Sequence, residues 1–247
     1  MHYGDQRVIG HLEWFDQGRS YDGIRAHYAP EKWWLDLFAV RVRETTPPVM
    51  DDDQWFAGLY AGCDWAEAYA LLFADDMAMA GETTTDDTRF LTLGLRVHRK
   101  RGNWDYSAEF TFQTGEVKGD DLSAFGFAAV GGYTFADADW TPRVGIEVDF
   151  ATGDEDPTDG DQGTLQTLFP TNHLHYGYAD LLGWANLLDL SLHLSAKPSE
   201  TVTITLDFHH FRRVEERGGW FNAGGAAYPG PARSGATSTL ATRWTSR

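Results

Sequence analysis

Apolar and polar residues alternate with a period of two along most of this chain. In residues 143–150 every second residue is Val, Ile or Phe, and the residues between them are charged or Gly. The stretches 188–194 and 202–208 repeat the pattern with polar residues between the apolar ones. Successive strand side chains point to opposite faces of a sheet, so each stretch has one apolar and one polar face. The alternation therefore predicts amphipathic β-strands.

The same pattern predicts about eleven strands with no helix between them. They are 7–15, 19–28, 33–43, 54–64, 66–75, 89–100, 104–115, 122–135, 141–152, 187–197 and 201–213. Strands of about ten residues are long enough to cross a bilayer at a tilt. Because the polar faces carry charges, we expect them to line water rather than a packed core. The predicted fold is all-β: an antiparallel transmembrane β-barrel, present as about 11–12 strands of a larger barrel.

Short and long connections alternate along most of the predicted strands. The long ones fall at 45–53, 76–88, 116–121, 153–186 and from 214 onward, and they carry much of the acid. Outer-membrane barrels have short periplasmic turns and longer external loops, so we expect this set to face outward. The formal net charge of -17 is then largely a property of the loops. Weak alternation near the end divides the chain into a barrel segment, 1–215, and a Gly/Pro/Ala-rich, irregular end, 216–247.

Composition narrows the class of protein. Hydrophobic residues make up 42% of the 247 residues. No stretch approaches the roughly 18 consecutive apolar residues of a transmembrane helix, which excludes a helical membrane protein. Many of the 10 Trp lie near predicted strand ends, as in the interfacial girdles of barrels, although aromatic residues favour strands in any β-protein. The acidic balance lacks the basic footprint of nucleic-acid binding.

Residues 1–6 lack the charged and apolar regions of a signal peptide, and the chain does not end on an obvious barrel-closing strand. We therefore expect a fragment that lacks the N-terminal strands and the signal peptide of a larger barrel.

Cations collect on the face that the alternation turns inward. The arginines expected to line a substrate path are Arg19, Arg25, Arg41, Arg43, Arg96 and Arg143. Rings of Arg and Lys select anions in pores, and interspersed acids keep the arginines ordered. The alternative is a polar lumen that is cross-braced by ion pairs and has no selectivity.

Other side chains suggest metal binding or catalysis, but weakly. The acids of 154–161 offer hard oxygen ligands for Ca²⁺, yet their spacing does not follow an EF-hand loop. His173 and His175 invite a metal interpretation, and Ser191 with His193 invites a hydrolytic one. Residues two apart on a strand are simply neighbours in any pore, so we predict no metal site and no catalytic residues.

Several motifs resemble those of a known family. They are Arg7–Trp14, Gly18–Ala26, Ala129–Phe135, Pro142–Pro157, Leu168–Leu187, Leu192–Pro198 and Trp220–Ala226. Together they resemble the alginate export family of outer-membrane β-barrels, and the Phe-Pro-Thr-Asn-His sequence of 169–173 is the most specific part.

This resemblance implies a monomeric barrel of about eighteen strands in the outer-membrane lipid of a bacterial cell. It implies an electropositive lumen that passes an anionic polysaccharide or a smaller anionic solute outward, with no covalent chemistry and no cofactor. By position in the motifs, Arg19, Asp22 and Arg25 become candidate path or gating residues. Asn172 and His173 become candidates for ordering the long loop.

Two other functions remain open. One is a non-conducting structural or carbohydrate-binding β-barrel fragment, which predicts extraction without detergent and a packed interior. The other is an outer-membrane hydrolase, which predicts turnover that a Ser191 or His193 substitution abolishes. Anion-favouring conductance blocked by uronate oligomers would favour the channel.

Overall fold

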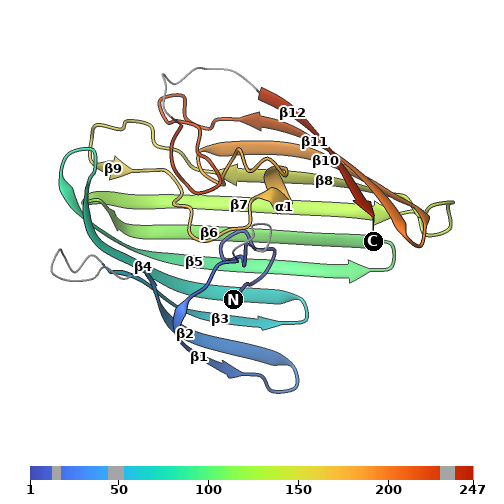
Figure 1. Ribbon diagram of the computed structural model, residues 1–247, viewed down its shortest axis with the longest axis horizontal. Coiled ribbons are helices and arrows are strands. Elements are labelled where there is room, and N and C mark those ends of the chain that lie inside the picture. Colours follow the sequence, from blue (N-terminus) through green and yellow to red (C-terminus); the bar gives the residue numbers. More distant parts are fainter. Residues whose placement is uncertain (13–17, 44–52, 229–236, 247) are drawn as a thin grey trace.

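The computed structural model describes residues 1–12, 18–43, 53–228 and, for the backbone, 237–246. In this part of the chain one sheet of twelve strands runs in the order β1-β2-β3-β4-β5-β6-β7-β8-β10-β11-β12, and β9 pairs β7 (Figure 1). The strands are β1 (Asp22–Tyr28), β2 (Trp33–Arg43), β3 (Gln54–Cys63), β4 (Ala66–Ala80), β5 (Thr85–Arg101), β6 (Trp104–Val117), β7 (Asp120–Thr134), β8 (Arg143–Ala151), β9 (Asp161–Gln162), β10 (Leu187–Ser199), β11 (Val202–Arg212) and β12 (Thr237–Ser246). All pairs on the main path are antiparallel.

The sheet confirms the predicted all-β, antiparallel class. Apart from the short β9, each strand pairs with the strands next to it in sequence, as in an up-and-down barrel wall, and no pairing joins β1 to β12 among the described residues. The described wall is therefore open. A single four-residue helix, α1 (His173–Tyr176), interrupts the strand pattern in this part of the chain. Over the same residues, no helix is long and apolar enough to span a bilayer.

The two faces of the sheet differ as the alternation predicts. On one face large apolar side chains are exposed, among them Ile146 at 64% and Leu95 at 53%. On the other face polar side chains such as Asp36, Thr92 and Gln113 are buried. No second sheet covers the apolar face among the described residues, so these side chains are placed to meet lipid.

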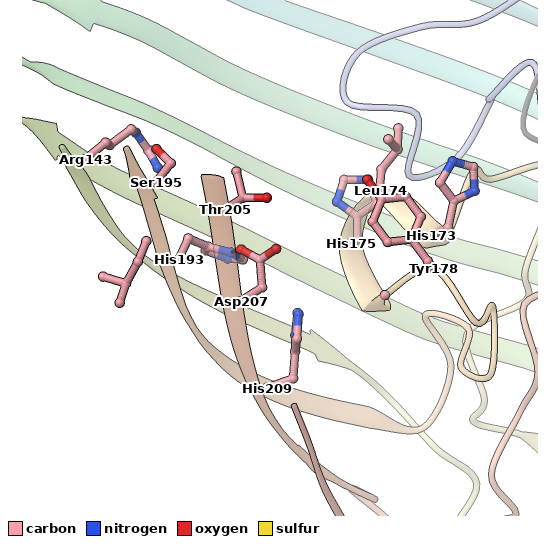
Figure 2. Close-up of a pocket in the computed structure, with 12 residues that line it drawn as sticks. Arg143, His173, Leu174, His175, Tyr178, His193, Ser195, Thr205, Asp207 and His209 are labelled. Atoms are coloured by element: carbon pink, nitrogen blue, oxygen red, sulfur yellow. Dashed lines mark hydrogen bonds and ion pairs between the residues drawn. The ribbon is translucent and has the colours of Figure 1, made fainter. Parts of the chain in front are cut away.

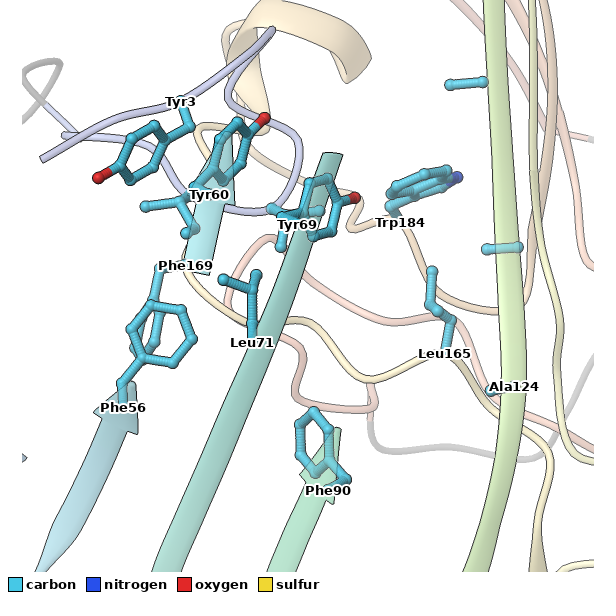
Figure 3. Close-up of a cluster of buried hydrophobic side chains, with 14 of the residues drawn as sticks. Tyr3, Phe56, Tyr60, Tyr69, Leu71, Phe90, Ala124, Leu165, Phe169 and Trp184 are labelled. Carbon is cyan, nitrogen blue, oxygen red and sulfur yellow. The ribbon is translucent and has the colours of Figure 1, made fainter. Parts of the chain in front are cut away.

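Two irregular segments cover the polar face. They are residues 1–12 and 163–186, which we call the inner segments, and Figure 1 shows both lying over one side of the sheet. Their backbones join directly: Ile9 forms a parallel bridge with Phe169, and Gly10 N–H donates to the Phe169 carbonyl over 2.7 Å. An apolar cluster packs between them and the sheet, including Ile9, Phe56, Leu71, Phe169 and Trp184 (Figure 3).

Three predicted features of the chain are wrong. Residues 7–12 of the predicted strand 7–15 form no strand apart from the bridge at Ile9, and 13–15 lie outside the described residues. The expected long connections 76–88 and 116–121 are instead strand ends joined by tight turns at 81–84 and 118–119. Residues 237–246 form β12 rather than an irregular end. The two-part division at residue 215 stays a prediction.

Candidate functional site

The centre of the inner face is organised by Arg7. Its guanidinium binds two carboxylates of β8, Glu147 and Asp149, with 2.8 Å to Asp149. It also donates to the Tyr176 hydroxyl over 3.3 Å. Burial by itself lowers the pKa of Arg7, but the negative charges of Asp149 and Glu147 outweigh burial and hold the pKa well above its ordinary value. Arg7 is therefore a permanent cation that joins segment 1–12 to the wall and to Tyr176.

A second ionic group lies beside the first. Asp5 accepts hydrogen bonds from the Arg96 guanidinium over 2.5 and 2.9 Å, and from the Ser107 hydroxyl over 2.6 Å. Arg96 also binds Glu67 over 2.9 Å. Burial raises the pKa of the Asp5 carboxyl, but the hydrogen bonds from Arg96 and Ser107 more than offset this and leave the pKa below its ordinary value. His175 donates from Nε2 to the Asp5 carbonyl over 2.8 Å and joins the two inner segments.

The predicted path arginines are spread over the wall rather than gathered in one ring. Five of them have carboxylate partners: Arg25 with Asp36 (2.7 Å), Arg41 with Asp53 (3.3 Å), Arg43 with Asp75 (2.6 Å), Arg96 with Asp5 and Glu67, and Arg143 with Asp105. Arg19 instead donates to backbone carbonyls of Gly10 and Phe169. Asp22 is exposed at the start of β1. The path role of these residues stays a prediction.

Five of the predicted site residues line three separate cavities. Arg143 and His173 line one of about 250 Å³, together with His193 and Asp207 (Figure 2). Arg19 and Asn172 line a cavity of about 470 Å³. Arg25 lines a third, of about 390 Å³.

The two residues predicted to order the long loop make contacts of that kind. Asn172 donates from Nδ2 to the Ala223 carbonyl over 2.7 Å, which ties the inner segment 163–186 to the chain beyond β11. His173 Nδ1 lies 3.7 Å from the Asp180 carboxylate. Their functional role is a prediction that these contacts support but do not test.

A possible hydrolytic group has the wrong geometry. Ser191 Oγ lies 2.9 Å from Nδ1 of His209, and Asp189 contacts that same nitrogen at 2.7 Å. A catalytic triad needs the serine and the carboxylate on opposite ring nitrogens, so this histidine cannot relay a proton between them. His193 is bound instead by Glu147 and Asp207.

The acidic loop after β8 is built from turns. Asp154 accepts a hydrogen bond from the backbone N–H of Asp156, and Asp159 accepts one from that of Asp161. Asp156 binds Arg217 over 3.0 Å. Within the described residues, no group of three or more His, Cys, Asp or Glu side chains is placed to hold a metal ion.

Sequence reasoning missed the residues that form the centre of the site. Arg7 belongs to a stretch that alternates like a strand and Asp5 lies just before it, so nothing local marked them as partners of β8 and β5. The aromatic residues Tyr3, Tyr60 and Tyr69 were not singled out either. For Tyr69 the one signal available was its pairing with Gly94 on the neighbouring strand, and finding that pair needs the register.

Comparisons with known proteins place the chain. A search of curated proteins finds no match. Among solved structures, the chain is similar to OmpT, an outer membrane protein of Vibrio cholerae, with 12% identity over 87% of this chain and a TM-score of 0.46. The chain spans 61% of that protein's length.

The family comparison covers nearly the whole chain. The alginate export family matches residues 1–244. The chain therefore belongs to the alginate export family and is a protein of the bacterial outer membrane.

Proposed function

We propose that this protein is an outer-membrane channel that passes an anionic polysaccharide, or a related anionic solute, by diffusion and without covalent chemistry. The observation that carries the proposal is the family match over residues 1–244. The sheet supports it, because apolar side chains face outward and charged ones face inward along the same strands.

Ion pairs on the inner face suggest how an anion would be passed along. Arg25 and Arg143 each bind one carboxylate, yet their side chains remain 47% and 26% exposed. A carboxylate of the solute would replace the protein's own carboxylate at each such arginine in turn. Exchange between similar partners is nearly balanced in energy, so each site binds weakly and releases readily. Weak binding at many sites favours movement over trapping.

The test is conductance of the purified protein in planar lipid bilayers. We expect currents that favour anions and that uronate oligomers block. Arg143→Gln and Arg25→Gln should each reduce the anion preference. Arg89→Gln is a matched control, because Arg89 has outward parity on β5 and a side chain that is 61% exposed. Cation-favouring currents, or equal effects of all three variants, would contradict the proposal.

One observation favours a second candidate, a non-conducting carbohydrate-binding wall. The inner segments cover part of the polar face and are held there by buried ion pairs at Arg7 and Arg96. This candidate predicts saccharide binding to the detergent-solubilised protein and no single-channel steps in bilayers. Steps that uronate oligomers block would exclude it.

A further inference from the structure

Three aromatic rings form a continuous surface on the inner face. They are Trp34 of β2, Tyr60 of β3 and Tyr69 of β4, which we call the aromatic platform. Trp34 and Tyr60 have ring centroids 5.6 Å apart and planes within 3°, and Tyr60 and Tyr69 are 5.1 Å apart and within 18°. Three adjacent strands thus present rings in nearly one orientation.

Glycines on the neighbouring strands make this surface possible. Gly62 is the register partner of Trp34, and a Cβ there would lie 2.6 Å from Cζ2 of the indole. Gly94 is the register partner of Tyr69, and a Cβ there would lie 2.0 Å from Cζ of that ring. Both rings therefore lean across the sheet over the next strand instead of standing upright.

An aromatic ring already lies on the platform. Tyr3, from inner segment 1–12, stacks on Tyr60 with centroids 4.2 Å apart and planes within 13° (Figure 3). It is also nearly parallel to Trp34, at 6.0 Å. Its hydroxyl donates to Asp36 over 2.8 Å, and a cavity of about 390 Å³ opens beside it.

Polar groups surround the rings. Tyr60 donates to Glu67 over 2.8 Å and Tyr69 to Glu109 over 2.6 Å. Arg25 binds Asp36 over 2.7 Å. A surface of ring faces bordered by carboxylates and a guanidinium suits a ligand that is flat and apolar on one side and has hydroxyls at its rim. A pyranose ring has this shape, with C–H groups on one face that interact with the electron-rich face of an aromatic ring.

We propose that the aromatic platform is a saccharide-binding subsite and that Tyr3 occupies the position of one sugar ring. The source of that sugar, a polysaccharide passing through the lumen, rests on the proposed function. Tyr3 imitates the ligand: a six-membered ring stacks on Tyr60, and a hydroxyl at its edge binds Asp36. A saccharide can bind only when Tyr3 has left the platform. The apparent affinity of the unmodified protein therefore equals the intrinsic affinity multiplied by the fraction of molecules in which Tyr3 is displaced.

The competing explanation is that the rings only cover glycines. Aromatic residues often pack over a glycine on the neighbouring strand and stabilise it. In that case Tyr3 is part of the packing, and removing it would create no binding. The two explanations differ in what happens when the ring of Tyr3 is removed.

The test is isothermal titration calorimetry of detergent-solubilised protein with a mannuronate tetrasaccharide. We expect Tyr3→Ala to bind about tenfold more tightly than the unmodified protein, because the competing ring is gone. Tyr3→Phe keeps the ring and loses only the hydrogen bond to Asp36, so it should show at most a small part of this gain. Trp34→Ala in the Tyr3→Ala background should remove the gain. Tyr106→Ala, on the exposed apolar face, is a matched control without effect.

Folding is checked by the β-sheet circular dichroism of each variant. Unchanged or weaker binding by folded Tyr3→Ala overturns the proposal, as does a gain that survives Trp34→Ala. If Tyr3→Ala does not fold, equal affinities of the unmodified protein and the Trp34→Ala single variant overturn it. Calorimetry needs no conduction. Binding without bilayer currents therefore rejects the channel and keeps the subsite, and currents without the gain reject the subsite alone.

Discussion

Arg7 illustrates how a buried ion pair acts on stability. Its guanidinium and the carboxylates of Glu147 and Asp149 are almost fully buried. Such a group adds little net stability compared with apolar residues of the same shape, but removing one partner leaves the other charges buried without compensation.

Arg7→Met should therefore lower the free energy of unfolding by about 3–5 kcal/mol. The measurement is urea-induced unfolding in detergent micelles. Arg89→Gln removes an exposed cation and should cost less than about 1 kcal/mol. Equal losses of unfolding free energy in the two variants would show that the destabilisation does not depend on burial of the Arg7 ion pairs.

His175 gives the inner segments a dependence on pH. Burial and the positive charge of Arg7 together lower its pKa from 6.5 to about 3, against the attraction of Glu147. The unfolded chain takes up a proton on this ring near pH 6.5, whereas the folded protein does not until about pH 3. This contribution to stability is complete above pH 6.5 and is lost progressively as the pH falls toward 3.

His175→Gln should make the free energy of unfolding fall less steeply between pH 6.5 and about 4. Glutamine can still donate to the Asp5 carbonyl, but it does not titrate. Unfolding free energies at half-unit pH intervals test this, with His210→Gln on the opposite face of the sheet as the control. A curve that remains as steep as that of the unmodified protein would assign the acid sensitivity to the carboxylates.

At the scale of elements, regular alternation predicted the strands well and their ends poorly. Strands β2, β3, β10 and β11 lie within a few residues of the predicted spans, because each has one continuous apolar row. Strands β4 and β5 run on through Asp75, Asp76, Asp86 and Asp87, where the pattern fails. Backbone pairing resumes there after an irregularity between Asp75 and Met79, because hydrogen bonds between strands do not depend on side-chain polarity.

The segment 7–12 shows the opposite error. Its alternation resembles that of a strand, but Val8, on the apolar parity, is buried in the apolar cluster instead of meeting lipid. Periodicity indicates which side chains share a face, but it does not indicate whether lipid, water or protein covers that face. The site at Arg7 could not be predicted for the same reason, because its partners lie 140 and 142 residues away.

The two inner segments should be separable by one added methyl group. A Cβ at Gly10 would lie 2.0 Å from Oγ1 of Thr171, so Gly10→Ala must push segment 1–12 away from segment 163–186. We expect faster proteolysis within residues 1–12 and a larger conductance. Gly18→Ala is the matched control, since the nearest atom there is 3.6 Å from the added carbon. Identical cleavage rates in the two variants would contradict this docking.

At the scale of the whole molecule, the exposed apolar face of the sheet is placed to meet hydrocarbon. Leu93 lies near the middle of β5 and is 42% exposed. Leu93→Arg should destabilise the protein in lipid by about 2–4 kcal/mol, which is typical of a cation on the lipid face at the bilayer midplane. Val202→Arg, at the end of β11, should cost about 0–1 kcal/mol. Refolding into liposomes from urea measures both, and similar costs would argue against a membrane boundary along this face.

The tall hairpins β4–β5 and β6–β7 have a consequence for anything that leaves the lumen. Strand β5 has 17 residues, more than the roughly 9–11 that cross a bilayer, so the sheet extends beyond the lipid at this end. Acidic residues outnumber basic ones in this extension, at 75–89 and 116–121. If the protein passes a polyanion outward, as proposed, the solute meets like charge within about 10 Å of these residues at 0.1 M salt and is repelled into the medium.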